Sequence, residues 1–428
     1  MQFDSSLDFA RNMDEQDSLR SFRQQFFIPQ HNGQDCVYFT GNSLGLQPKS
    51  VIDKLKIELE DWSHHGVDGH FDGRNPWFHY HKFSTESVAR IVGAKPLEVV
   101  VMNNLTVNLH LMMVSFYRPA GKRYKIVMEA GAFPSDQYAM ESQVKFHGYA
   151  YDDAVIEVKP RSGEYGLRTE DILQTIDDHG DEIALVMFSG VQYYTGQAFN
   201  MKAIAQKAHE VGALAGFDLA HAAGNLVLKL HDWEVDFAVW CSYKYLNSGP
   251  GGVSGVFVHE KYANSPELPR FAGWWGHKES ERFLMKRGYI PETGAAGWQL
   301  SNAPVLTMAA HRASLDLFDQ VTMEQLNEKS VLLNGYLQFV VEEAAQENSE
   351  LQFEIITPME RGCQLSVLTG SNGKQLFDFL TEHGVIADWR EPNVIRMAPV
   401  PMYNSFEDIQ RFGSILRSFG KQPSEMNG

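Results

Sequence analysis

The chain has few cysteines and no long apolar run. It has three cysteines in 428 residues, Cys36, Cys241 and Cys363, and none is near another in the sequence. This odd, sparse count provides no disulfide framework and no cysteine metal motif, and it is typical of a reducing compartment. No stretch approaches the roughly 18 apolar residues of a membrane span. The first twenty residues alternate charged and polar side chains, unlike a signal peptide, so a cytoplasmic location is expected.

Basic residues are also in the minority. Lys and Arg number 37 against 54 Asp and Glu, which gives a formal net charge of −17. An acidic chain repels phosphate backbones and anionic lipid surfaces, so neither nucleic acid nor a membrane is an expected partner. The 43% apolar content is enough for a sizeable core and excludes global disorder. The length indicates two or three domains.

The middle of the chain alternates apolar strands with helices. The first fifty residues look irregular, and the first thirty carry no recognisable motif. A helix then begins near Ser50, with Val51, Leu55, Leu59 and Trp62 on one face at helical spacing. Strands that are apolar throughout and separated by helices indicate a parallel sheet covered on both faces. The predicted strands span residues 99–102, 125–128, 183–188, 213–217, 237–241 and 253–258.

The pattern changes after about residue 303. A long helix over residues 323–345 precedes strand candidates at 364–368 and 394–397, and a last apolar helical face begins at Phe406. The sequence therefore predicts an α/β fold with a large domain around a mainly parallel sheet and a smaller α/β domain. The large domain is expected over residues 45–304, and the small domain over residues 1–44 together with 305–428.

Two residues at predicted strand ends suggest a cofactor. Open α/β sheets bind ligands at the carboxyl ends of their strands. Asp218 closes one strand and Lys244 follows the next. Taken singly, such an Asp is as often a turn cap, and such a Lys more often extends to solvent. Together they match pyridoxal phosphate, whose aldehyde needs an amine and whose ring nitrogen needs an anion.

Two further features fit the same cofactor, and a third, Arg396, indicates an anionic partner. Thr106 lies at a strand-to-helix junction, where helix amides and a hydroxyl suit a phosphate, although an ordinary N-cap is the alternative. Phe133 and Ser135, in a Phe-Pro-Ser-Asp string, are placed to cover a ring and reach phosphate, although the string also reads as a common helix start. Arg396 lies on an apolar strand and needs an anion, either an internal acid or a substrate carboxylate.

A histidine-rich segment is the main competing signal. A metal site would require fixed ligand spacing and carboxylates, and the histidines show no helical pair at the needed spacing. No metal is therefore expected. The segment contains His64, His65, His70, His79 and His81.

Longer strings resemble the kynureninase family, which belongs to the class V aminotransferase group of fold-type I pyridoxal-phosphate enzymes. The resemblance runs in order from about residue 38 to the last helix. The strings that carry it are residues 38–45, 104–110, 133–136, 193–197, 216–221, 243–247, 273–274 and 396–399.

The resemblance implies a site that binds pyridoxal 5'-phosphate. Lys244 would hold the aldehyde and later act as the base, Asp218 would pair with the ring nitrogen, and Tyr243 would transfer protons at the substrate carbonyl. His70, Ser301, Asn302 and Arg396 would bind substrate, with Arg396 on its α-carboxylate. The full cofactor set would be Leu105, Thr106, Phe133, Pro134, Ser135, Asp136, Ser189, Asp218, His221, Tyr243, Lys244, Trp274 and Asn302.

The resemblance also implies an activity. The reaction would be hydrolysis of the Cβ–Cγ bond of L-kynurenine to anthranilate and L-alanine, of 3-hydroxy-L-kynurenine to 3-hydroxyanthranilate and L-alanine, or of both. The enzyme would serve tryptophan catabolism or NAD biosynthesis as a homodimer, with Trp274 and Asn302 donated across the interface. The alternative is another class V enzyme, either a cysteine desulfurase or an aminotransferase. A desulfurase needs a mobile nucleophilic cysteine, and neither Cys241 nor Cys363 is well placed for that role.

Overall fold

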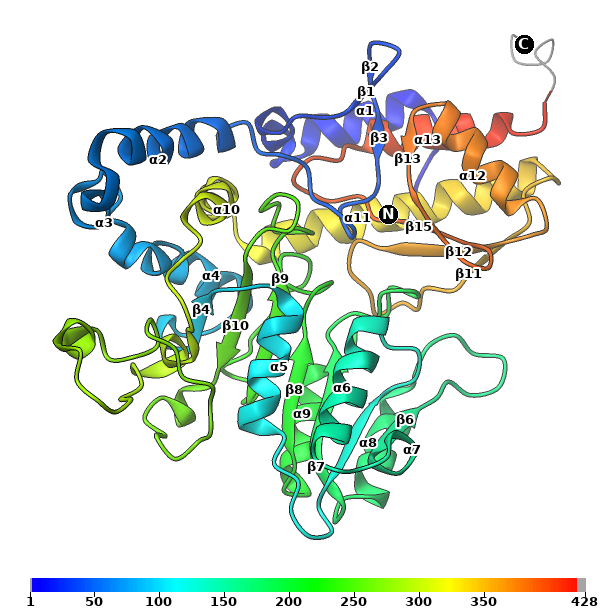
Figure 1. Cartoon of the computed structure of the whole chain (residues 1–428). Helices are drawn as coiled ribbons and strands as arrows, with labels where there is room; N and C mark the ends of the chain where they lie inside the picture. The colour runs from blue at the N-terminus through cyan, green and yellow to red at the C-terminus, as the bar shows by residue number, and fades with distance from the viewer. Residues whose placement is uncertain (1, 422–428) are drawn as a thin grey trace. The chain divides into compact units, whose positions relative to one another are not determined.

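The computed structural model describes residues 2–421, which divide by their contacts into two compact units. Figure 1 shows the course of the chain through both units. The larger unit comprises residues 50–193 and 198–320. The smaller unit comprises residues 2–49, 194–197 and 321–421.

These boundaries differ from the predicted ones, which fall after residues 44 and 304. Helix α10 (Val305–Phe318) lies in the larger unit because it packs against α2 (Val51–His65). The two helices are also joined by an ion pair, in which Lys54 Nζ lies 2.6 Å from Asp316 Oδ2. The chain therefore enters the smaller unit only after α10 ends.

The larger unit is built on a seven-stranded sheet. Most neighbouring strands pair in parallel, as the sequence predicts, but β10 is antiparallel to both of its neighbours. The chain passes from β9 to β10 without a helix between them, as an antiparallel pair allows, because an antiparallel return needs no crossover helix. In spatial order the strands are β4 (Val99–Val101), β10 (Ser254–Val258), β9 (Phe237–Cys241), β8 (Leu214–Asp218), β7 (Ile183–Ser189), β5 (Lys125–Glu129) and β6 (Val155–Val158).

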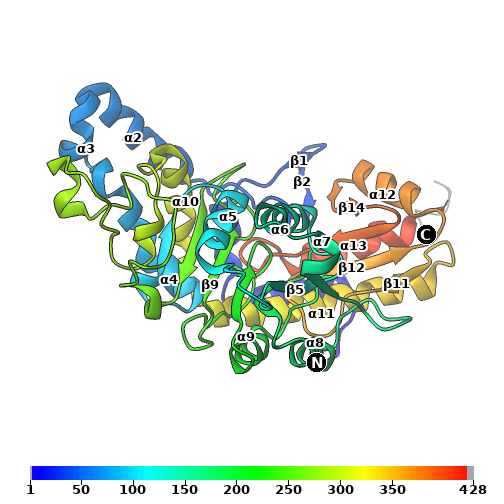
Figure 2. The same cartoon turned by 60° about the horizontal axis from the view of Figure 1, so that its bottom comes forward.

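Helices cover both faces of this sheet. In Figure 2, α5 and α6 lie on one face, and α8 and α9 lie on the other. Apolar side chains such as Met112 and Phe116 of α5 pack into the core between helix and sheet. The α-helices not yet given are α3 (Gly69–Asp72), α4 (Thr85–Val92), α5 (Leu105–Phe116), α6 (Pro134–Phe146), α7 (Tyr151–Ala154), α8 (Thr169–Asp178) and α9 (Met201–Glu210). The 3₁₀ turns are η2 (Gly66–Asp68), η3 (Trp77–Ser84), η4 (Pro96–Glu98), η5 (Glu260–Tyr262), η6 (Glu279–Leu284) and η7 (Gly294–Trp298).

The smaller unit packs helices against a four-stranded antiparallel sheet. The predicted long helix and both predicted strands are present. Sheet order is β11 (Phe353–Ile355), β12 (Leu365–Thr369), β15 (Val394–Met397) and β14 (Asp388–Arg390). The helices are α1 (Leu7–Gln16), η1 (Arg20–Gln25), α11 (Met323–Glu347), α12 (Gly373–Glu382) and α13 (Phe406–Ser418). Two small pairs complete the unit, namely β1 (Gln30–His31) with β2 (Gln34–Asp35), and β3 (Val37–Tyr38) with β13 (Val385–Ile386).

The expectation of an irregular N-terminal segment is wrong for residues 7–16, which form α1. The Ser6 side chain caps this helix by accepting from the Phe9 amide, and Ala10 and Met13 are buried in the core of the smaller unit. Tertiary packing and the cap outweigh the weak helical pattern of this polar stretch.

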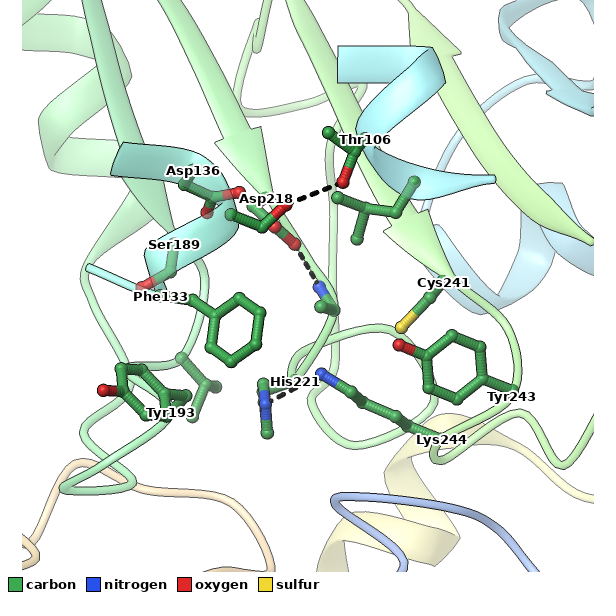
Figure 3. A pocket seen from close by; sticks show the side chains of 14 residues that line it. Thr106, Phe133, Asp136, Ser189, Tyr193, Asp218, His221, Cys241, Tyr243 and Lys244 are labelled. Atoms are coloured by element: carbon green, nitrogen blue, oxygen red, sulfur yellow. Dashed lines mark hydrogen bonds between the residues drawn. The ribbon is translucent and has the colours of Figure 1, made fainter. Parts of the chain in front are cut away.

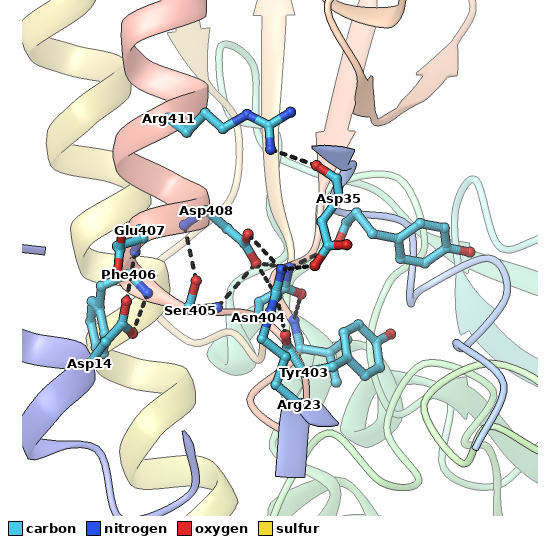
Figure 4. A network of polar contacts seen from close by, with 12 residues as sticks. Asp14, Arg23, Asp35, Tyr403, Asn404, Ser405, Phe406, Glu407, Asp408 and Arg411 are labelled. Carbon is cyan, nitrogen blue, oxygen red and sulfur yellow. Dashed lines mark hydrogen bonds and ion pairs between the residues drawn. The ribbon is translucent and has the colours of Figure 1, made fainter. Parts of the chain in front are cut away.

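Polar contacts fasten this N-terminal segment to α13 (Figure 4). Asp14 accepts from the backbone amides of Phe406 and Glu407, at 2.8 and 2.9 Å. Arg23 donates to Asp408 at 2.7 Å and to the Tyr403 carbonyl at 2.6 Å. The Asp14 carboxylate thus satisfies amides at the start of α13 that have no partner inside the helix. Within the part of the chain that the structure describes, no helix is long and apolar enough to cross a membrane.

Candidate active site

Four strands of the larger sheet end in polar side chains at one edge. They are Glu129 on β5, Ser189 on β7, Asp218 on β8 and Cys241 on β9. Because β5, β7, β8 and β9 are parallel neighbours, their carboxyl ends meet, and Ser189 is the register partner of Asp218. A pocket opens at this edge, with about 510 Å³ of space between protein atoms, its mouth included. The site thus forms where open α/β sheets bind ligands.

Most of the predicted site residues line this one pocket, and all of these belong to the larger unit (Figure 3). They are Leu105, Thr106, Phe133, Ser135, Asp136, Ser189, Asp218, His221, Tyr243 and Lys244.

Lys244 provides the amine of the pocket. It follows β9, and its Nζ lies 3.0 Å from His221 Nε2, while the Phe133 ring centroid is 5.7 Å from the same nitrogen. Figure 3 shows the lysine extending toward His221. A half-buried amine held between an imidazole and an aromatic ring is well placed for condensation with an aldehyde.

Two buried carboxyls face the same pocket. Asp218 accepts from the Ala220 amide at 2.6 Å. Burial and the nearby Asp218 charge raise the pKa of Asp136 well above its usual range. Burial also raises the pKa of Asp218, but the Ala220 amide, the Lys244 charge and a hydrogen bond with Asp136 oppose that shift. The proton of the pair therefore belongs on Asp136, which donates to Asp218 and leaves Asp218 as the anion.

One side of the pocket is formed where two helices begin. Leu105 is the first residue of α5, and α6 begins at Pro134, directly before Ser135. The hydroxyls of Thr106 and Ser135 lie 2.8 Å apart. Two helix N-termini with adjacent hydroxyls make a site for a dianion, because unpaired amides and the helix dipoles both favour negative charge.

Tyr243 brings a phenol hydroxyl to the pocket. Burial raises its pKa, and a hydrogen bond with Cys241 adds to the shift, so the hydroxyl keeps its proton at neutral pH. Burial also raises the pKa of the Cys241 thiol. Tyr243 is therefore available to donate to an oxygen that gains charge during a reaction.

The structure adds four pocket residues that the predicted set lacks: Val191, Tyr193, Ala220 and Cys241. Tyr193 belongs to one of the strings that resemble the family, and its ring packs edge-on against Phe133 at 5.2 Å. A search for residues just beyond each strand end would have found all four, since they follow β7, follow β8 or end β9.

Five predicted residues of the larger unit do not line the pocket in the described chain. Pro134 is the first residue of α6. His70 Nδ1 contacts the Val67 carbonyl at 2.9 Å, and Trp274 Nε1 donates to the Arg282 carbonyl. The other two, Ser301 and Asn302, are exposed.

Arg396 belongs to the smaller unit. It is buried on β15 and forms an ion pair with Asp388 of the neighbouring β14. Of the two readings that the sequence leaves open, this contact supports an internal ion pair. A role in holding a substrate carboxylate stays a prediction.

Among residues 2–421, one other cluster has side chains of the kinds that bind metals, namely Glu98, His231 and His259. Hydrogen bonds account for it, because Glu98 Oε1 lies 2.9 Å from His231 Nδ1, and His259 Nδ1 accepts from the Lys261 amide. The two imidazoles are stacked with planes 13° apart. Lone pairs in nearly parallel ring planes do not converge on one ion, so this geometry favours a structural role.

The donor set of the main pocket fits pyridoxal phosphate. The amine of Lys244, the anion of Asp218 and the helix starts at Leu105 and Pro134 match the aldehyde, ring nitrogen and phosphate of that molecule. The Phe133 ring adds an apolar surface beside them. These residues would hold the cofactor, and the chemistry that it supplies is an electron sink.

Comparisons with known proteins extend over nearly the whole chain. Residues 326–416 match a family model described as the kynureninase C-terminal domain. A kynureninase of Flavobacterium psychrophilum is 55% identical, with 97% of this chain and 99% of the relative covered. A kynureninase of Myxococcus xanthus is 55% identical over 98% and 99%, and one of Nematostella vectensis is 48% identical over 96% and 94%.

Solved structures agree on the fold. The cystine C–S lyase C-DES has a TM-score of 0.74 at 16% identity, covering 90% of this chain and 98% of that chain. A cysteine desulfurase of Thermococcus onnurineus has a TM-score of 0.71 at 18% identity, covering 90% and 94%. The predicted fold class is thus confirmed. Because kynureninases are 48–55% identical to this chain over 96–98% of its length, the chain belongs to the kynureninase family.

Proposed function

We propose that this chain is a pyridoxal-phosphate-dependent hydrolase that cleaves the Cβ–Cγ bond of L-kynurenine, of 3-hydroxy-L-kynurenine, or of both. The products are L-alanine and anthranilate or 3-hydroxyanthranilate. The observation that carries the proposal is the meeting of Lys244 and Asp218 in one pocket, in a chain 55% identical to kynureninases. The cytoplasm is the proposed location, in tryptophan catabolism or NAD biosynthesis.

Each of three side chains has a separate role in the proposed reaction, set by its charge and protonation state. When bound, the cofactor supplies an electron sink for the substrate. Lys244 moves the proton at the substrate α-carbon, and Asp218 provides the anion opposite the ring nitrogen. The Tyr243 hydroxyl donates to the γ-carbonyl oxygen as water adds to that carbon. The Cβ–Cγ bond then breaks, and the aryl carboxylic acid departs.

Arg396 is our candidate for the substrate α-carboxylate. The planar guanidinium of Arg396 suits bidentate binding of a carboxylate, and a substrate carboxylate would compete there with Asp388, its partner in the structure. Arg396→Ala should therefore raise KM far more than it lowers kcat. An unchanged KM would leave the ion pair as its whole role.

A cysteine desulfurase is the alternative enzyme. Such a reaction needs a thiolate nucleophile on a mobile segment. Burial raises the pKa of Cys241, at the end of β9, and raises that of Cys363 to about 12. Both thiols therefore stay protonated at neutral pH, which favours the hydrolase.

A homodimer is the proposed assembly. The apolar face of α2 that the sequence marks is only partly buried within the chain, since Val51 is buried but Leu59 is 48% and Trp62 59% exposed. Ile52 on the same helix and Phe71 on α3 are also more than half exposed. A large exposed apolar surface commonly marks a protein–protein interface. We propose that a second copy of this chain packs against it. His70, Trp274, Ser301 and Asn302 would then complete the site of the partner and set the preference between the two substrates.

The test is product analysis of the purified protein. Adding L-kynurenine should give anthranilate fluorescence and an equal amount of alanine, and Lys244→Ala should abolish both. Steady-state kinetics with both kynurenines would then determine the preferred substrate. Sulfide release from L-cysteine without anthranilate formation would favour the desulfurase instead.

A further inference from the structure

Glu129 is a buried acid that none of the roles above uses. It is the last residue of β5 and is 2% exposed, and it is not among the residues that line the pocket. Ser189 donates to it twice. The Ser189 hydroxyl is 2.5 Å from Glu129 Oε1, and the Ser189 amide is 3.2 Å from each carboxylate oxygen.

The surroundings of Glu129 make its charge costly. Among the described residues, no Lys, Arg or His nitrogen lies within 4.0 Å of its carboxylate. Asp218 on β8 raises its pKa through charge, and the β6 residue beside it is Val158. Lys244 lines the pocket, where its charge acts on Asp218 and its Nζ contacts His221 Nε2.

Glu129 also acts on Asp136 of α6. The Glu129 charge is one of the influences that raise the pKa of Asp136, together with burial and Asp218, while Lys244 opposes them. The larger unit therefore brings three buried carboxyls, Glu129, Asp136 and Asp218, to one strand edge. Three such groups beside one ammonium cannot all ionise, so they must share protons.

We propose that Glu129 is a positioning residue of the cofactor site. It holds Ser189 in place through two hydrogen bonds, and its charge makes ionisation of Asp136 unfavourable. Asp136 then keeps its proton and donates it to Asp218, and Asp218 alone presents a negative charge to the ring nitrogen of the cofactor. Glu129 works through its neighbours and does not itself touch the bound molecule.

The role depends on pH in a defined way. Burial raises the pKa of Glu129 to about 7. Glu129→Gln keeps a side chain that can bind Ser189 but removes the charge at every pH, so it resembles the wild type below pH 7. The affinities of the wild type and the variant for pyridoxal phosphate should therefore be equal at acidic pH and differ at weakly basic pH.

The experiment measures binding of pyridoxal phosphate to the full-length apoprotein across pH. Near pH 8, Glu129→Gln should bind about tenfold more weakly than wild type, the factor of a one-unit pKa shift. Near pH 6 the two should agree within about twofold. Glu170→Gln on α8, an exposed carboxyl, is the matched control and should follow wild type throughout. Identical profiles, or a constant offset at all pH values, would overturn the proposal, since a merely structural defect would not depend on pH.

A second readout locates the proton without any turnover. The infrared band of a protonated carboxyl in the apoprotein near pH 8 should disappear in Asp136→Asn. In Glu129→Gln at the same pH the band should weaken, because the Glu129 charge is one of the influences that keep the proton on Asp136. A band that is unchanged in Glu129→Gln, or that persists in Asp136→Asn, would overturn the assignment. The inference rests on the proposed cofactor site, but the infrared arm does not require catalysis, so its failure can be told apart from failure of the proposed function.

Discussion

Among single residues, the proposed cofactor site depends on which of two carboxyls, Asp136 or Asp218, carries the negative charge. Asp218 and Asp136 lie in the same buried pocket, and their environments separate their proton affinities in the way that active sites commonly do. The sequence predicts both residues from a strand end and a helix start. It does not predict Glu129, because an acid that closes an apolar strand looks like any exposed strand end until the structure shows its burial.

Asp218→Asn should bind pyridoxal phosphate and lose most of its turnover. The amide keeps the shape of the side chain but removes the anion that stabilises a protonated ring nitrogen, and losses of one such electrostatic contact cost about 100-fold or more in kcat. Cofactor absorbance and anthranilate formation, measured on the same sample, check both parts. Turnover at the wild-type rate in the variant would exclude this role.

Glu129 should also make the free energy of unfolding depend on pH. Its pKa is raised from 4.5 to about 7 on folding, so between these values the folded state binds more protons than the unfolded state. The free energy of unfolding therefore falls as pH rises through this window, by at most about 3 kcal/mol, and stays lower above it. Urea unfolding of wild type and Glu129→Gln, near pH 5 and near pH 8, should show this loss in wild type alone. Equal pH dependence in both proteins would contradict it.

At the scale of elements, apolar periodicity predicts most of the strands and helices but not their directions. The six predicted strands of the large sheet are present, but β10 runs antiparallel, since an apolar run carries no sign of direction. Strand β6 and helix α1 are missing from the prediction, because both are short and depend on tertiary contacts. The helix starts at Leu105 and Pro134 are predicted well, since strand-to-helix junctions carry their own signals.

The start of α13 offers a test at this scale. Asp14 accepts from two amides there, so Asp14→Ala should lower the free energy of unfolding of the smaller unit by about 1–2 kcal/mol, a typical value for a helix cap. Glu15→Ala removes an exposed carboxylate from the same helix and serves as the control. Chemical denaturation of the two variants side by side checks the difference. Equal stability would show that the contact contributes nothing.

For the whole molecule, the sequence predicts the domains but not the contacts that set their boundary or pair their side chains. The sequence predicts two α/β domains, but contacts draw their boundary after α10, because packing rather than pattern decides where a helix belongs. A buried Arg396 is foreseeable from its apolar flanks, but its partner Asp388 is not, since pairing across strands depends on register. The spacing of apolar residues predicts that one face of α2 is apolar. It does not predict whether the same chain or a second copy packs against that face.

The proposed dimer is tested on that face. Trp62→Asp places a charge on the exposed apolar side of α2, where it should cost the assembly much and the folded chain little. Sedimentation at several concentrations should show a dimer for wild type and a shift toward monomer for the variant. Asp53→Asn, on the same helix, is the control. A monomeric wild type would contradict the assembly.

The most direct measurement of the central claim is chemical trapping of the amine. The holoprotein is reduced with borohydride in the presence of pyridoxal phosphate, digested and sequenced by mass spectrometry. The account predicts that the reduced cofactor is attached to Lys244 and that Lys244→Ala takes up no label. A label on another lysine, or an unmodified Lys244 in a protein that still forms anthranilate, would contradict it.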